Sequence, residues 1–199
     1  LQKNDTSDMH FSNFGDFLYY AYANLQMLHY CISNGLEKYD RTCYMIRAKA
    51  YKAYKEGRWH IHDLLNENVS KIQQNDVCWY CGKAMSPKQL TKDHVFPRSK
   101  GGDNNMDNII MTCKACNSSK GNMDLFKWYA EVRKEWPPLN VIVHYMKNIY
   151  LYCAANDLFD KSFDELNNMD LPFDWRYIPQ KYPQPAAFLH AATEMPQVQ

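Results

Sequence analysis

The sequence lacks the features that would place it among membrane, secreted or fibrous proteins. None of its apolar runs approaches the roughly 18 residues that a membrane-spanning helix needs. The segment Leu1–Ser12 does not have the basic and then apolar layout of a secretory signal peptide. Internal repeats and low-complexity tracts are also absent. With 46% hydrophobic and 23% charged residues, the composition predicts a soluble, globular, cytoplasmic protein.

The sequence also has little net charge, +1 at pH 7, but its charges are unevenly distributed. Residues 40–58 contain six cations and two acids, and residues 78–121 contain seven cations and three acids. Beyond residue 150 the balance reverses, with three cations and seven acids. The two basic segments predict attraction to a polyanion, against the alternative of ordinary solvated surface. A further hypothesis is that the acidic tail lies against the basic centre and limits access to it.

Periodicity and turn residues predict most of the secondary structure. The expected helices cover Phe14–Ile32, Arg41–Lys55, His60–Gln73, Asp124–Trp136 and Val141–Ala155. In the centre of the chain, short strands are expected over Leu90–Phe96 and Asn108–Thr112. Frequent prolines from Leu171 onward predict an irregular tail.

Two Cys-x-x-Cys pairs are the strongest local signal. Cys78 and Cys81 form the first pair, Cys113 and Cys116 form the second, and 31 residues separate them. Four thiolates in such pairs are typical of a tetrahedral structural zinc site that leaves no open position for catalysis. The 31 residues between the two pairs are therefore predicted to form a folded segment of their own. The remaining cysteines are predicted to be buried thiols: Cys31, Cys43 and Cys153.

The segment between the cysteine pairs contains a second set of motif residues. In chain order they are Asp93, His94, Pro97, Gly101, Gly102, Asp107 and Asn108, followed after the second pair by Asn117 and Lys120. With the four cysteines, this order resembles the HNH nuclease family in its ββα-metal form, over residues 76–125. The resemblance implies an α+β fold, mainly helical, around a small ββα core with a zinc ribbon-like four-cysteine site.

The resemblance also implies a catalytic site, and the chemistry of the side chains is consistent with it. A histidine can take a proton from water at neutral pH, so His94 is the predicted general base. Asp93 and Asn117 offer hard oxygen ligands for a catalytic Mg²⁺ or Mn²⁺, separate from the structural Zn²⁺. Asn117 occupies the third motif position, where the family has His or Asn. The three motif residues are then His94, Asn108 and Asn117, so the site is an HNN variant. Asn108 is predicted to hydrogen-bond the loop between the strands and so to orient His94.

Four cations near this site are predicted to attract the nucleic-acid backbone rather than to read bases: Lys92, Arg98, Lys100 and Lys120. One geometric difficulty concerns Asp93 and His94, because adjacent residues of a regular strand point to opposite faces. Either the strand ends or is distorted there, of which we expect distortion because the motif resemblance requires it, or one of the two residues is structural.

The predicted organisation has three parts. Residues 1–75 form an N-terminal helical extension, residues 76–125 form the HNH core with its zinc site, and residues 126–199 form C-terminal helices and a proline-rich acidic tail. The predicted function is that of a metal-dependent DNA endonuclease, a nickase if it acts as a monomer, since one such site cuts one strand. Restriction and phage defence are among the settings that employ this nuclease module.

Two alternatives remain open at this stage. In the first alternative, the chain is a zinc-stabilised nucleic-acid-binding module without catalysis. In the second, it is a subunit that docks a partner protein through its long apolar helices. A homodimer is a further form in which two sites would cut both strands. Binding alone gives no reason for Asp93, His94 and Asn117 to accompany the cysteine pairs, which favours the nuclease.

Overall fold

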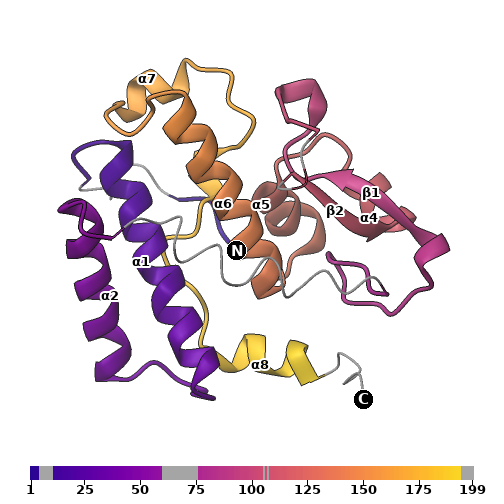
Figure 1. The fold of residues 1–199 in the computed structure, drawn as a ribbon, viewed down its shortest axis with the longest axis horizontal. Coiled ribbons are helices and arrows are strands. Elements are labelled where there is room, and N and C mark those ends of the chain that lie inside the picture. The colour runs from indigo at the N-terminus through magenta and orange to yellow at the C-terminus, as the bar shows by residue number, and fades with distance from the viewer. Residues whose placement is uncertain (5–10, 60–75, 105, 107, 194–199) are drawn as a thin grey trace.

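The computed structural model describes residues 1–4, 11–59, 76–104, 106 and 108–193. The helix expected over His60–Gln73 and the motif residue Asp107 lie outside the described residues. Within them, the protein is mainly helical and contains one small antiparallel sheet of two strands (Figure 1). This arrangement confirms the predicted α+β class, with a ββα core and a four-cysteine cluster.

The N-terminal part is a pair of helices, α1 (Phe14–Ser33) and α2 (Arg41–Lys55), that lie side by side in Figure 1. Each begins where a side chain caps the first turn. Asn13 accepts a hydrogen bond from the Asp16 N–H at 2.9 Å, and Asp40 accepts one from the Cys43 N–H at 2.9 Å. Both helices match the predicted ranges closely because periodicity, cap and stop signals agree at each end.

The centre of the chain forms the ββα unit. A short 3₁₀ turn, η2 (Pro87–Gln89), leads into β1 (Leu90–His94), which pairs with β2 (Ile109–Cys113), and α4 (Lys114–Lys120) follows directly. A second 3₁₀ turn, η3 (Arg98–Lys100), lies in the connection between the strands. The pairing runs from Leu90 opposite Cys113 to His94 opposite Ile109. The strand is therefore regular as far as His94 and ends there, so the expected distortion is not found, whereas the alternative that the strand ends at this point is.

The C-terminal part continues with short helices around one long one. These are α5 (Leu125–Trp128), a π-helical turn η4 (Tyr129–Arg133), α6 (Leu139–Ala155), α7 (Phe163–Asn167), the 3₁₀ turn η5 (Trp175–Tyr177) and α8 (Ala186–Thr193). The single helix expected over Asp124–Trp136 is shorter and changes to π geometry. It ends at Arg133, where the C-cap residue Lys134 has a left-handed φ of 54°, and Pro137 and Pro138 follow three residues later.

The apolar helix α6 lies between the helical pair and the ββα unit (Figure 1). On one side the Tyr22 hydroxyl of α1 donates to the carbonyl of Met146. On the other side Phe96 packs edge to face on Tyr145, with ring centroids 5.3 Å apart. One hydrophobic cluster consequently includes residues from all three predicted parts of the chain, and the proposed boundaries after residues 75 and 125 stay a prediction. Among the described helices, none has both the length and the hydropathy to cross a bilayer.

Candidate nuclease site

The first cysteine pair forms a tight knuckle at the start of the ββα unit. The Gly82 N–H donates to the Cys78 carbonyl at 2.8 Å, and Gly82 has a φ of 69°, which favours glycine. The Trp79 N–H donates to the Met111 carbonyl at 3.0 Å and so attaches the knuckle to β2. The backbone therefore positions the first two thiols beside the strand that leads to the second pair.

The second pair completes a four-sulfur cluster. Cys113 ends β2, and its sulfur accepts a hydrogen bond from the Cys116 N–H at 3.4 Å. The sulfur atoms of Cys78, Cys81, Cys113 and Cys116 all lie within 4.8 Å of one another. Tetrahedral zinc with Zn–S bonds of about 2.3 Å holds its sulfur atoms about 3.8 Å apart, so a small contraction closes the site on an ion.

The neighbourhood of the cluster also suits four thiolates. The Arg133 guanidinium donates to the Cys116 sulfur at 3.6 Å, and a cation there offsets part of the excess negative charge of a Zn²⁺ ion with four thiolate ligands. The remaining cysteines are buried, as predicted. Cys31 and Cys43 face each other between α1 and α2, and Cys153 lies in α6.

Asp93 points inward from β1. Its carboxylate oxygen Oδ2 accepts a hydrogen bond from the Tyr80 hydroxyl at 2.7 Å and lies 3.2 Å from the Lys120 ammonium. Both partners are buried, since Asp93 is 7% and Lys120 is 1% exposed. Burial lowers the pKa of Lys120, and the negative charge of Asp93 opposes that shift. Lys120 was expected on the path of the nucleic-acid backbone, but it is enclosed in this pair and does not reach the surface.

Helix α4 lies across the same face of β1. The Asn117 amide donates to the Thr91 hydroxyl and to the Lys92 carbonyl, each at 3.2 Å. One turn further along, the Lys120 ammonium donates to the His94 carbonyl at 3.0 Å. One turn of α4 thus follows the last residues of the strand, with Asn117 on Thr91 and Lys92 and with Lys120 on Asp93 and His94.

His94 points away from that buried pair. Its side chain is partly exposed, and Nε2 lies 2.8 Å from the Asn104 amide oxygen in the loop before β2. In the described part of the chain, no hydrogen bond or ion pair joins the imidazole to Asp93 or Asn117. Asn117 therefore contacts the strand at the residues just before Asp93, whereas the His94 side chain is directed to the connecting loop.

Asn108 fixes the loop that follows His94. Its side-chain oxygen accepts from the Phe96 N–H at 2.7 Å, and its amide donates to the carbonyls of Phe96 at 3.1 Å and Asp103 at 2.8 Å. This is the loop contact predicted for the middle motif residue. Gly102 is part of the same contact, because a Cβ at this position would lie 2.0 Å from the Phe96 carbonyl oxygen.

Comparison with known proteins places this geometry in a family. Residues 78–124 match the family model described as HNH endonuclease. This segment is an HNH endonuclease domain. The CRISPR-associated endonuclease Cas9 of Corynebacterium diphtheriae is 37% identical over 57 residues, and that of Actinomyces naeslundii is 31% identical over 75 residues.

The similarity to these relatives is confined to a short part of each protein. It covers 28% and 37% of this chain, and only 5% and 7% of the relatives themselves. The HNH domain supports a nuclease type of function, and the remainder of the chain lies outside the family match.

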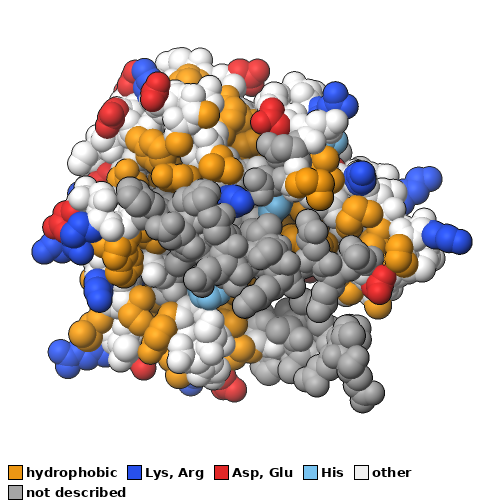
Figure 2. All heavy atoms as spheres, viewed as in Figure 1, with side chains coloured by type: hydrophobic (Ala, Val, Ile, Leu, Met, Phe, Trp, Pro, Cys, Tyr) orange, Lys and Arg blue, Asp and Glu red, His pale blue; other side chains and the backbone are white. Residues whose placement is uncertain are grey.

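The surface of the HNH domain is basic. Lys92, Arg98 and Lys100 are exposed, as their predicted role requires. Figure 2 shows Lys and Arg side chains along the right-hand side of the molecule, where the HNH domain lies in the same view. Unlike Lys120, these cations are accessible to a large anion.

Three further side chains contact the HNH residues and were not singled out from the sequence. The Tyr80 hydroxyl donates a hydrogen bond to Asp93, and the Asn104 side chain contacts the His94 imidazole. The Arg133 guanidinium donates to the Cys116 sulfur. Tyr80 and Asn104 occur within the motif region, but their partners depend on the strand register and on the loop conformation. Arg133 lies beyond the motif and is brought back by the π-helical turn, for which the sequence carries no signal that we can name.

Proposed function

We propose that this chain is a metal-dependent endonuclease that hydrolyses phosphodiester bonds in DNA, with His94 as the general base. The observation that carries the proposal is the HNH domain itself, in which a partly exposed imidazole ends β1 beside a buried carboxylate. The CRISPR-associated endonucleases that share this segment support nuclease chemistry. A role in restriction or phage defence is part of the proposal.

Asp93 and Asn117 are the proposed ligands of a catalytic Mg²⁺ or Mn²⁺. Their oxygens are hard donors that suit either ion, and Asn117 contacts the strand one and two residues before Asp93. Because Asp93 Oδ2 is engaged by Tyr80 and Lys120, its second oxygen, Oδ1, is the proposed ligand atom. When bound, such an ion supplies positive charge for the phosphate and the leaving oxygen. Zn²⁺ is the proposed occupant of the four-cysteine cluster.

His94 accepts the proton of the attacking water in this mechanism. With Nε2 protonated and donating to the Asn104 oxygen, Nδ1 is left unprotonated as the base. Asn108 holds the loop that carries Asn104 and so acts as a positioning residue. Lys92, Arg98 and Lys100 attract the DNA backbone without reading bases. One site cuts one strand, so a monomer produces nicks.

The test uses supercoiled plasmid with the purified full chain and added Mg²⁺ or Mn²⁺. We expect open circles from the wild type and a loss of at least about 100-fold in rate for His94→Ala, which is the usual contribution of a general base. Lys38→Ala, at an exposed position between α1 and α2, is the matched control and keeps the wild-type rate. Undiminished cutting by the His94 variant would remove the proposed base. Linear product in a single encounter would favour a dimer.

A further inference from the structure

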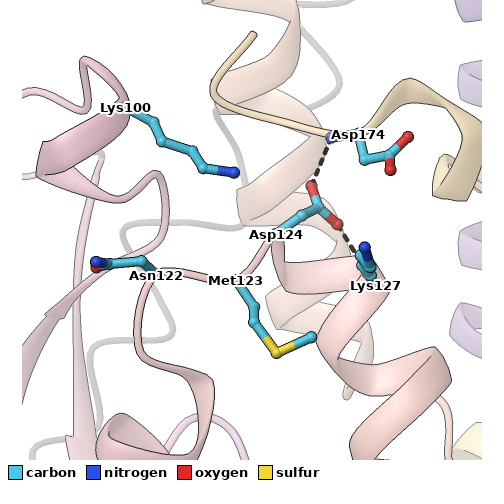
Figure 3. A pocket seen from close by; sticks show the side chains of 6 residues that line it. All are labelled: Lys100, Asn122, Met123, Asp124, Lys127 and Asp174. Atoms are coloured by element: carbon cyan, nitrogen blue, oxygen red, sulfur yellow. Dashed lines mark hydrogen bonds between the residues drawn. The ribbon is translucent and has the colours of Figure 1, made fainter. Parts of the chain in front are cut away.

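A cleft lies beside the HNH site, where the loop after β1 meets the chain that follows α4. It has a volume of about 380 Å³ and is lined by Lys100, Asn122, Met123, Asp124, Lys127 and Asp174 (Figure 3). Lys100 extends from the loop toward Asp124 and Asp174 in this view. The cleft is near the proposed catalytic residues in the fold, because η3 begins four residues after His94 and Asn122 follows Lys120 closely.

The first carboxylate of the cleft is already satisfied by hydrogen bonds. Asp124 accepts from the N–H groups of Lys127 at 2.7 Å and Asp174 at 2.9 Å, and from the Tyr145 hydroxyl. It is only 4% exposed, and burial raises its pKa. Asp124 therefore serves as a backbone cap and presents little negative charge to the cleft.

The second carboxylate is neutralised by an arginine. Both oxygens of Asp174 accept from the Arg176 guanidinium, at 2.7 and 2.8 Å. This pairing also bears on the hypothesis that the acidic tail blocks the basic centre. Asp174 does reach the edge of the HNH domain, but its charge is committed to Arg176.

The cations of the cleft have no such partners. Within the described residues, neither the Lys100 nor the Lys127 ammonium takes part in a hydrogen bond or an ion pair. Lys100 and Asn122 are exposed, and Lys127 is partly exposed. The cleft thus combines two unpaired ammonium groups and an amide with two satisfied carboxylates, so its unused groups are mainly hydrogen-bond donors and its charge is positive.

We propose that this cleft binds a phosphate group through Lys100, Lys127 and Asn122, and that the group belongs to the nucleic-acid strand beside the cleavage site. That the phosphate belongs to a nucleic-acid strand rests on the proposed function, whereas the binding of an anion rests on the residues of the cleft alone. Lysines bind phosphate as point charges and carry no base preference, so the subsite positions a strand without reading it.

Binding of a labelled DNA duplex, followed by fluorescence anisotropy across a salt series without added Mg²⁺ or Mn²⁺, tests the proposal. Each neutralised phosphate contributes a slope of about −0.9 to the plot of log affinity against log salt. We expect Lys100→Gln and Lys127→Gln each to reduce the slope and to weaken binding several-fold on any sequence, with a reduction of about one in the double variant because both lysines contact one phosphate. Lys127→Arg should keep the wild-type slope, and Lys38→Gln is the matched surface control.

Cleavage plays no part in this measurement, so the subsite and the nuclease proposal fail separately. An unchanged slope in Lys127→Gln, together with no saturable binding of inorganic phosphate, would overturn the subsite even if the plasmid is cut. A lower slope in Lys100→Gln alone would not rescue it, because Lys100 is also proposed to attract DNA outside the cleft. Titration with inorganic phosphate distinguishes the source of the ligand. Saturable binding of free phosphate that is lost in Lys127→Gln, with unchanged duplex slopes, would overturn the assignment to a nucleic-acid strand.

Discussion

At the open end of the β-hairpin, four cysteine sulfur atoms lie within 4.8 Å of one another, whereas at its loop end the proposed catalytic side chains lie on two faces of β1. Asp93 is buried against Lys120, and His94 is turned toward Asn104. Both groups of residues belong to one domain of 47 residues, and both are proposed to hold a metal ion.

The difference follows from what organises each group. The cysteines are brought together by tight knuckles and by the register of β1 with β2, so the backbone alone gathers them. The catalytic residues are adjacent on a regular strand, which separates their side chains, and one of them is held by a buried cation. We therefore expect loss of zinc to damage the fold, and changes at Asp93 or His94 to act more locally.

The largest expected effect is on the cysteine cluster. Cys113→Ser removes one of four ligands, and structural zinc contributes about 10–16 kcal/mol in small zinc-binding peptides. We expect this variant to lose its zinc and the hydrogen-exchange protection of residues 78–124. Cys153→Ala, a buried cysteine outside the cluster, should keep one zinc per chain. Equal zinc content in the two variants, measured by elemental analysis, would show that the four sulfur atoms do not form the site.

The next effect concerns the buried ion pair. Lys120→Met leaves the Asp93 carboxylate without its cation, and breaking a buried pair in this way costs about 3–5 kcal/mol. Urea unfolding should show this loss, whereas Lys92→Met at the exposed neighbouring position should stay within about 0.5 kcal/mol of the wild type. A small effect in Lys120→Met would mean that the Asp93 carboxylate does not depend on Lys120 in the folded protein.

This ion pair also marks where prediction from the sequence ends. The cysteine cluster and the helix limits of α2 were predictable because their signals are local: spacing, periodicity and a capping aspartate. The sequence predicts that Lys120 attracts the nucleic-acid backbone, because it is a cation close to the motif residues. Its actual position depends on how α4 crosses β1, and that crossing combines strand register with helix packing. The Asn104 contact to His94 likewise depends on the conformation of the connecting loop, which Asn108 and Gly102 fix by close contacts.

A smaller effect is expected in that loop. Asn108→Ala removes at least three hydrogen bonds to the loop backbone, two of them buried, and should cost about 2–3 kcal/mol in unfolding free energy, with slower plasmid cleavage. Asn104→Ala is the informative comparison, because within the described residues its side chain is hydrogen-bonded only to His94. It should reduce cleavage while stability stays within about 0.5 kcal/mol. Equal loss of stability in both variants would contradict the distinction between a loop anchor and a contact to the base.

The smallest expected effect concerns Asp124, a buried aspartate that, unlike Asp93, caps backbone N–H groups instead of pairing closely with a cation. Burial raises its pKa in the folded protein, so its contribution to stability is fully present below the unfolded pKa of about 3.9 and is lost as pH rises through the folded value. Asp124→Asn removes this titration but also weakens the cap. We therefore expect the variant to be less stable at pH 4 and its deficit to shrink toward neutral pH, in urea unfolding at several pH values. Asp164→Asn, at an exposed position, is the control. A deficit that grows with pH would mean that the ionised carboxylate is favoured by its N–H donors despite its burial.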